Sequence, residues 1–179
     1  MNPVFLVRRA LVLPALLAVA VLSGCASQMT HQEMTPVPVK VATQHPQSVT
    51  ITAMSIPGSD LVGTMVTVPE LQAAVTNALV ASKAFADVKG KGGDYQLTVQ
   101  IFNVNHPSFG MSFTSKVEAG WTLKRADTGA VVWQEAIKSE HTTGAGEAFA
   151  GVERLKMSIA GAIRNNITTG VAHIGTAKL

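Results

Sequence analysis

Residues 111–124, the first part of the segment 111–141, alternate between apolar and polar side chains over a longer span than any other part of the chain, and this pattern constrains the fold most. A period of two places successive side chains on opposite faces of a β-strand. The residues expected to face a core are Met111, Phe113, Val117, Ala119, Trp121 and Leu123. The residues expected to face water are Ser112, Thr114, Lys116, Glu118, Thr122 and Lys124. The segment therefore predicts a sheet with one wet face.

The same segment contains its own turn. Asp127, Thr128 and Gly129 are residues typical of a tight turn, and apolar residues at positions 131, 133 and 137 open the next strand. We therefore predict one long hairpin over 111–141. Trp121 and Trp133 both fall in apolar rows, so we expect them to pack in the core or across strands.

Two shorter segments also alternate with a period of two. Val49, Ile51 and Ala53 alternate with threonines, and the apolar residues of 95–101 alternate with Gln and Thr. Both patterns predict strands with one apolar face. Residues 57–60 contain Pro, Gly, Ser and Asp, which predicts a loop, and residues 61–67 are ambiguous.

Two segments show helical spacing. Pro69 suits the first turn of a helix, and Glu70 complements the positive end of the helix dipole. The apolar stripe of this first helix is Leu71, Val75, Ala78, Leu79 and Ser82, and Phe85 and Val88 are expected to close its exit. The stripe of the second helix is Val152, Leu155, Ile159, Ile163, Ile167 and Val171, with Gly170 and Gly175 expected to fray its end.

The predicted order is strand, helix, three strands, helix. Each helix has one apolar stripe and the sheet has one apolar face, so the simplest burial is an α+β two-layer sandwich. We expect about four mainly antiparallel strands with both helices on one face. Residues 47–179 are predicted to form this single domain, which is long enough to bury a core.

The N-terminus has the layout of a secretory signal peptide. Arg8 and Arg9 precede an uncharged apolar run from Ala10 to Leu22. That run is about 13 residues long and contains Pro14, whereas a helix that spans a bilayer needs about 20 apolar residues. A cleaved signal peptide over residues 1–24 is therefore favoured over a retained membrane-spanning helix.

The sequence Leu22-Ser23-Gly24-Cys25 resembles the lipobox of bacterial lipoproteins. The resemblance implies cleavage between Gly24 and Cys25 and acylation of Cys25. Each buried methylene contributes about 0.8 kcal/mol, so two or three acyl chains would anchor the chain durably in a membrane. Cys25 is the only cysteine, which excludes an internal disulfide and otherwise leaves an unpaired thiol in a secreted protein.

The lipobox resemblance also predicts a destination. An aspartate directly after the lipidated cysteine tends to retain such proteins in the inner membrane, and here that position holds Ala26. The outer membrane, periplasmic face, is therefore expected. Residues 25–46 are polar and punctuated by prolines without a sustained period, which predicts a flexible tether after the lipidated cysteine.

Composition and spacing argue against several functions. Without Arg8 and Arg9 the mature chain has 12 basic and 11 acidic residues, and it contains no basic stripe that would indicate nucleic acid binding. Residues 143–151 are glycine-rich but match neither a dinucleotide fingerprint nor a Walker loop. The sequence shows no Gly-x-Ser-x-Gly nucleophile elbow, no His or Cys ligands at the spacing of a zinc site, and no close pair of carboxylates. It therefore predicts no catalytic residue, metal or cofactor.

Histidines are the remaining candidates for chemistry. His31 and His45 fall in the predicted tether, and His173 falls at the predicted end of the second helix. His106 and His141 are the two in the hairpin region, so they are the candidate ligand-binding residues. Solvent-exposed histidines without such a role are the competing interpretation, because a metal centre needs three or four converging ligands.

The layout as a whole resembles a family. A lipobox, a proline-bearing tether, the strand Asp94-Tyr95-Gln96-Leu97-Thr98-Val99, a hairpin turning at Asp127-Thr128-Gly129 and a terminal helix are similar to the YajG-type small lipoproteins. The resemblance is looser to two-layer domains of lipopolysaccharide-assembly and penicillin-binding-protein-activating lipoproteins and of TolB. Proteins of this kind are mostly non-catalytic, so the resemblance implies a protein without catalytic activity. Relatives sometimes carry the label of UDP-N-acetylglucosamine acyltransferase, but the hexapeptide repeats of that enzyme class do not occur here.

The expected function is that of a non-enzymatic outer-membrane lipoprotein. Its domain would face the periplasm and act as an adaptor or assembly component that binds an envelope protein, with the membrane engaged through the N-terminal lipid. The alternative is a periplasmic ligand-binding module, or a hydrolase or transferase, that uses the loops 106–110 and 144–151. A polar pocket converging near His106 or His141 would favour the alternative.

Overall fold

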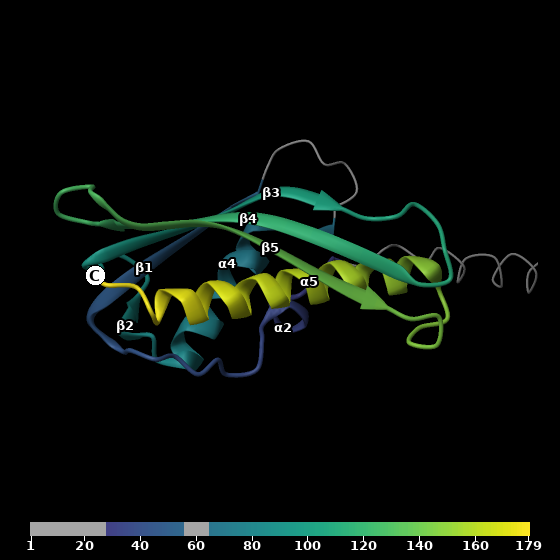
Figure 1. Ribbon diagram of the computed structural model, residues 1–179, viewed down its shortest axis with the longest axis horizontal. Helices are drawn as coiled ribbons and strands as arrows, with labels where there is room; N and C mark the ends of the chain where they lie inside the picture. Colours follow the sequence, from purple (N-terminus) through teal and green to yellow (C-terminus); the bar gives the residue numbers. More distant parts are fainter. Residues whose placement is uncertain (1–27, 56–64) are drawn as a thin grey trace, which may run out of the picture.

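Five strands form one mixed sheet, and helices cover one of its faces (Figure 1). The computed structural model describes residues 28–55 and 65–179. In chain order the elements are α2 (His31–Met34), β1 (His45–Ser55), α4 (Val68–Ser82), β2 (Phe85–Lys89), β3 (Tyr95–Asn105), β4 (Phe113–Arg125), β5 (Val131–Thr143) and α5 (Gly151–Ile174). The predicted signal peptide, Cys25 and the predicted loop 57–60 lie outside the described residues. Within the described ranges, no helix is long and apolar enough to cross a membrane.

The strand order across the sheet is β2-β1-β3-β4-β5. β1 runs parallel to both of its neighbours, whereas β3, β4 and β5 are antiparallel. The predicted α+β class is confirmed, and Figure 1 shows the helices on one side of the sheet. The prediction of about four mainly antiparallel strands and two helices is corrected, within residues 28–55 and 65–179, to a mixed sheet of five strands with three helices.

β2 is a strand that the sequence pattern does not predict. Phe85 and Val88 were expected to close the exit of a helix, but they belong to a strand that pairs with β1. Lys83 ends α4 in the left-handed conformation with φ of 56°, which redirects the chain into the strand. Phe85 is buried, and its ring centroid lies 5.3 Å from that of His45. Five residues carry too short a pattern to identify a strand whose existence depends on pairing with β1.

The described part of the predicted tether is packed against the domain. Met29 and Met34 are fully buried, and Glu33 forms an ion pair with Lys156 of α5 at 2.8 Å. Arg164 of α5 donates two hydrogen bonds to the Glu33 carbonyl. The prediction of a flexible tether is therefore wrong for residues 28–46, because their scattered apolar residues become buried through tertiary contacts.

The first long helix, α4, is confirmed with the expected buried stripe. The Thr67 side chain caps it by accepting a hydrogen bond from the Glu70 backbone N–H, and Pro69 lies in its first turn. The Glu70 carboxylate accepts hydrogen bonds from the His31 ring and backbone N–H. These bonds hold the pKa of Glu70 below its ordinary value and join α2 to the start of α4.

The long hairpin is confirmed as β4 and β5. Gly129 occupies its turn with φ of 70°, which a residue without a side chain adopts readily. Trp121 is fully buried, as expected, whereas Trp133 is only half-buried against the core. Met111 was expected on the apolar face, but it precedes β4 and is 77% exposed.

The terminal helix α5 lies along β4 and β5 (Figure 1). Its predicted stripe is buried from Leu155 to Val171, while Val152 at the start is 47% exposed. Gly170 was expected to fray the helix, but it lies within α5 against Trp121. A Cβ at Gly170 would come within 2.5 Å of the indole ring, so this glycine is required for close approach of helix and sheet.

Candidate functional site

The two candidate histidines of the hairpin region do not converge on a common site. The Nδ1 atom of His106 lies 3.3 Å from the carbonyl oxygen of Pro107, its own neighbour. His141 lies on β5, where its ring packs against Gly161 of α5 so closely that a Cβ there would come within 2.2 Å of the ring. His141 therefore has a packing role in the described structure, and the two residues form no shared pocket with each other there.

The other described histidines serve the fold. His45 was assigned to the tether, but it begins β1, is buried, and lies 2.9 Å through Nε2 from the carbonyl of Ile174. His173 was assigned to a frayed end, but it lies in α5 with Nδ1 2.8 Å from Glu135 Oε1. In residues 28–55 and 65–179, no group of three His, Cys, Asp or Glu residues gathers as a metal site would require.

The glycine-rich loop after β5 closes on itself. The Gly144 N–H donates to Glu147 Oε1 at 2.6 Å, and the Glu147 N–H donates to the Gly144 carbonyl at 3.2 Å. Arg154 Nη1 then donates to the carbonyls of Ala148 and Phe149. The loop is thus a braced turn that leads into α5.

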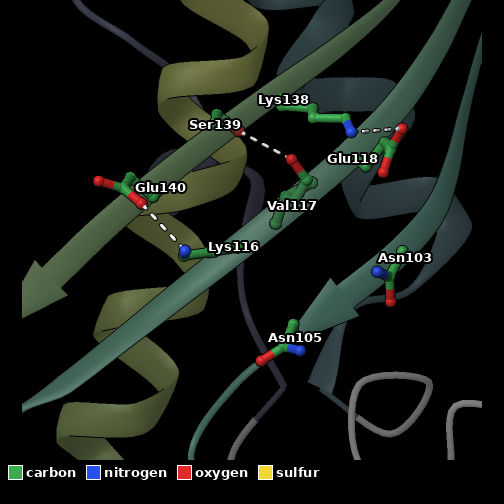
Figure 2. Close-up of a pocket in the computed structure, with 8 residues that line it drawn as sticks. All are labelled: Asn103, Asn105, Lys116, Val117, Glu118, Lys138, Ser139 and Glu140. Atoms are coloured by element: carbon green, nitrogen blue, oxygen red, sulfur yellow. Dashed lines mark hydrogen bonds and ion pairs between the residues drawn. The ribbon is translucent and has the colours of Figure 1, made fainter.

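The most developed polar surface lies on the face of the sheet opposite the helices. A hollow of about 490 Å³ is centred on β3, β4 and β5 near the end of β3 (Figure 2). Its lining includes six polar side chains that point outward from these strands: Asn103, Asn105, Lys116, Glu118, Lys138 and Glu140. We call this surface the outer-face hollow.

The sheet register arranges these side chains in two rows of three. Asn103, Glu118 and Lys138 are direct cross-strand neighbours and make the first row. Asn105, Lys116 and Glu140 make the second row. Lys138 Nζ lies 3.6 Å from Glu118 Oε1, and Lys116 Nζ lies 3.7 Å from Glu140 Oε2, as the dashed lines in Figure 2 show. The acidic and basic groups therefore alternate in both directions.

A bulge in β3 borders the outer-face hollow. The register shifts between Ile101 and Asn103, and the ring of Phe102 lies over Gly120 of β4. A Cβ at Gly120 would come within 2.4 Å of that ring, so the glycine makes the space in which Phe102 rests. Phe102 remains 45% exposed beside the charged rows. The outer face thus joins an aromatic ring to a patterned set of charges and amides.

The ion pairs of the outer-face hollow add little to stability. The side chains of Lys116, Glu140 and Lys138 are 67%, 66% and 77% exposed, and that of Glu118 is 34% exposed. Exposed pairs of this kind contribute roughly 0 to 1 kcal/mol because water screens them. Alternating charges can instead define which partner surface fits and in which orientation, and the two asparagine amides add donors and acceptors.

The edge of β5 is less open than this face. Asn165 of α5 donates to the carbonyl of Glu140, and Asn166 donates to that of Ile137, both at 2.8 Å. The Ser139 hydroxyl donates to the carbonyl of Ala162 in α5 at 2.8 Å. Helix side chains therefore occupy part of the hydrogen-bonding capacity that an added strand would need.

The alternation in the sequence predicts that Lys116 and Glu118 face water, but it does not predict the outer-face hollow. The sequence does contain a signal for the pairing within the hairpin. Lys116 and Glu140 are equally far in sequence from Thr128 at the turn centre, and so are Glu118 and Lys138. No comparable signal gave the position of the asparagines. Their alignment depends on the bulge after Ile101.

Comparisons with known proteins identify the fold. No family model matches the chain. No curated protein matches its sequence either. A Xanthomonas campestris protein of the DUF330 family has a similar structure, with a TM-score of 0.62 and 13% identity over 79% of this chain and 92% of that chain. A hypothetical protein from Chlamydia trachomatis has a TM-score of 0.58 and 8% identity over 74% of this chain and 97% of that chain.

A minor lipoprotein from Acinetobacter baumannii matches more loosely. Its TM-score is 0.46, with 7% identity over 72% of this chain and 90% of that chain. At these identities, the two stronger similarities show a shared fold and nothing about activity.

Proposed function

We propose that this chain is a YajG-like outer-membrane lipoprotein, anchored by acyl chains on Cys25, whose domain acts in the periplasm as a non-enzymatic adaptor. The lipobox at 22–25 and Ala26 support the anchor and the destination. The outer-face hollow supports the adaptor role, because a protein partner is recognised by patterned surface charge around an apolar contact.

The observation that carries the adaptor role is the alternation of charge on an uncovered sheet face. The helices bury the opposite face, and the outer rows pair Lys138 with Glu118 and Lys116 with Glu140. These exposed pairs are nearly neutral for stability, so their arrangement is available for recognition. Phe102 beside them offers the apolar contact that interface centres favour.

The enzymatic alternative finds less support in the described residues. The loop 106–110 presents His106 to its own neighbour Pro107, and the loop 144–151 is a turn closed by Glu147 and Arg154. His141 is directed to α5 instead of to either loop. A ligand-binding module would have to bind its ligand in the outer-face hollow. Photocrosslinking distinguishes a small ligand at this surface from a protein partner.

Photocrosslinking in living cells tests the proposal. A photoreactive phenylalanine analogue in place of Ala136, which is exposed on β5 beside Lys138, should yield a discrete crosslinked protein. The same analogue in place of Val80, exposed on α4, should yield none. Crosslinks from Val80 alone, or a small-molecule ligand without any crosslinked protein, would contradict the adaptor role of the outer face.

A charge exchange sharpens the test. The double change Lys138→Glu and Glu118→Lys keeps net charge and the cross-strand pair but reverses the pattern. It should leave the melting curve unchanged and reduce the crosslink from position 136 at least tenfold, equivalent to about 1.4 kcal/mol. The matched control is Asp87→Lys with Lys91→Glu, two exposed residues in and just after β2, which should leave the crosslink intact. An undiminished crosslink in the first variant would refute charge recognition.

A further inference from the structure

Large apolar side chains are exposed to solvent at one end of the domain. Phe109 and Met111 lie in the loop between β3 and β4 and are 87% and 77% exposed. Phe149 lies in the loop between β5 and α5 and is fully exposed, and Val152 in the first turn of α5 is 47% exposed. We call these four residues the apolar tip. Clustered exposed apolar side chains mark a contact surface on a water-soluble domain.

The two loops of the apolar tip adjoin and are braced. Phe113 at the start of β4 pairs with Thr143 at the end of β5, so the loops leave neighbouring strand ends. The Arg154 guanidinium lies 5.9 Å from the centre of the Phe113 ring, and its Nη1 donates to the carbonyl of Phe149 at 2.9 Å. The hydrogen bond from Arg154 thus fixes the backbone of Phe149 in the position that leaves its side chain exposed.

Both loops are nearly free of charge. Residues 106–112 include no Asp, Glu, Lys or Arg, and residues 144–150 include only Glu147. The Glu147 carboxylate accepts a hydrogen bond from the Gly144 N–H within its own loop. Charged groups are costly to move out of water, whereas Phe and Met side chains gain by leaving it. The composition of the apolar tip therefore suits the boundary between lipid headgroups and acyl chains.

The N-terminal segment favours a membrane as the occupant. Met29 is fully buried, and Glu33 pairs with Lys156, one helical turn after Val152 of the apolar tip. Cys25 precedes Met29 by four residues, which can span at most about 14 Å when fully extended. A lipid on Cys25 would therefore hold this end of the domain close to the bilayer.

We infer that the apolar tip inserts into the surface of the membrane that holds the Cys25 lipid, and this inference rests on the proposed anchor. The domain then stands on the bilayer through two contacts, the lipid and the tip. Figure 1 shows that the strands run along the long axis, with the two loops together at one end and the β4–β5 turn at the other. The outer-face hollow would consequently face sideways into the periplasm, where a partner can reach it.

Depth measurement on the intact lipidated protein tests the inference. With Cys25 acylated, Phe149→Cys introduces the one free thiol for an environment-sensitive dye. In vesicles of phosphatidylethanolamine and phosphatidylglycerol, the dye should emit at shorter wavelength and be quenched by brominated acyl chains. The control is Val131→Cys, half exposed at the opposite end of the hairpin, where the dye should behave as in buffer. Equal behaviour of the two dyes would overturn the inference.

A form that begins at Ala26 separates tip insertion from the lipid anchor. It keeps every residue that the structure describes but lacks Cys25, so any binding to the same vesicles must come from the folded domain. Phe109→Ser with Phe149→Ser should weaken this binding at least about tenfold, and Val37→Ser with Val131→Ser should leave it unchanged. Tip-dependent binding would support insertion even if Cys25 proved unmodified. Unchanged binding in the double serine variant, or no binding by the parent, would refute it.

Discussion

The indole of Trp121 lies directly on Gly170, where a Cβ atom would come within 2.5 Å of ring atoms Cε2 and Cζ2. Trp121 is fully buried on β4, and Gly170 lies in the last third of α5. This contact sets how closely the helix approaches the sheet. It also explains why a residue of poor helix propensity occupies the interior of the longest helix among the described residues.

Gly170→Ala should therefore destabilise the domain. Overpacking a well-filled core costs about 1 to 3 kcal/mol, which outweighs the gain of up to about 1 kcal/mol in helix propensity. Urea unfolding of the form that begins at Ala26 measures the difference. Gly146→Ala is the control, because a Cβ there meets nothing within 4 Å and should leave stability nearly unchanged. A stabilised Gly170→Ala variant would contradict the contact.

A second prediction concerns the hydrogen bonds around the same indole. Trp121 Nε1 donates to Asn166 Oδ1 at 2.9 Å, and Asn166 Nδ2 donates to the carbonyl of Ile137 at 2.8 Å. Asn166→Ala would leave a buried indole N–H and a backbone carbonyl without these partners, which costs about 1 to 3 kcal/mol. In a double-mutant cycle with Trp121→Phe, measured by urea unfolding, the two losses should be less than additive. Strict additivity would mean that the amide acts independently of the indole.

The sequence is sufficient to predict a helix or strand where the apolar pattern of that element is long and local. The β4–β5 hairpin was predicted from its alternation and from Gly129 at its turn, and α4 and α5 from their stripes. These signals are strong because one face of β4, α4 and α5 is buried along most of its length. The α+β class followed from them.

Elements that depend on distant partners could not be predicted in this way. β2 becomes a strand because Phe85 and Val88 meet β1, which precedes them by a whole helix. Met29 and Met34 become buried, and α2, which contains Met34, contacts both α4 and α5, although no period marks these two residues. Gly170 has the sequence signature of a helix end, and only the position of Trp121 reveals its packing role.

The candidate site shows the same division. The alternation predicted that Lys116 and Glu118 face water, but the outer-face hollow needs the register of three strands and the bulge beside Phe102. Trp133 illustrates the limit of alternation, since it lies in an apolar row yet is only half-buried near the end of the sheet.

A third prediction concerns pH and the N-terminal segment. Burial of Glu33 raises its pKa, but hydrogen bonds from Lys156 and Thr30 outweigh that effect and hold the pKa below the ordinary 4.5. A carboxylate with a lowered pKa stabilises the fold above its ordinary pKa, and this contribution is lost as the pH falls through the lowered value. Stability from Glu33 should therefore be complete at pH 7, decline as the pH falls below the ordinary pKa of 4.5, and be lost once the pH is well below the lowered pKa.

Glu33→Gln should lower the free energy of unfolding at pH 7 by about 1 to 3 kcal/mol, a range reduced for the partial exposure of Glu33. The difference from the parent should vanish in strongly acidic solution. Urea unfolding across pH values measures both. The control is Glu140→Gln in the pair with Lys116, whose two side chains are each about two-thirds exposed, and there about 0.5 kcal/mol or less is expected at any pH. A constant difference between Glu33→Gln and parent at all pH values would exclude a titrating carboxylate as its origin.

The fourth prediction concerns the anchor. Cys25→Ala should leave an uncleaved or soluble protein, because Cys25 is the only cysteine in the chain and therefore the only lipidation site that the lipobox provides. Intact mass of the membrane-extracted parent should show acyl chains on residue 25 and no residues before it. A parent protein that is cleaved before Cys25 but carries no lipid on it would disprove the anchor. The control is Ser23→Ala in the same motif, which should remain acylated.

The fifth prediction separates the adaptor from an enzyme that uses the hairpin-region histidines. The His106 ring lies within hydrogen-bonding distance of the neighbouring Pro107 carbonyl, and His141 packs on Gly161, so neither geometry requires acid–base chemistry. His106→Ala with His141→Leu, which preserves an apolar contact with the helix, should keep the protein folded, anchored and able to complement a deletion strain under envelope stress. Loss of a catalytic acid or base would cost on the order of 10² to 10⁴ in rate. Failed complementation, with an unchanged melting curve and membrane level, would therefore contradict the adaptor function and favour an enzyme.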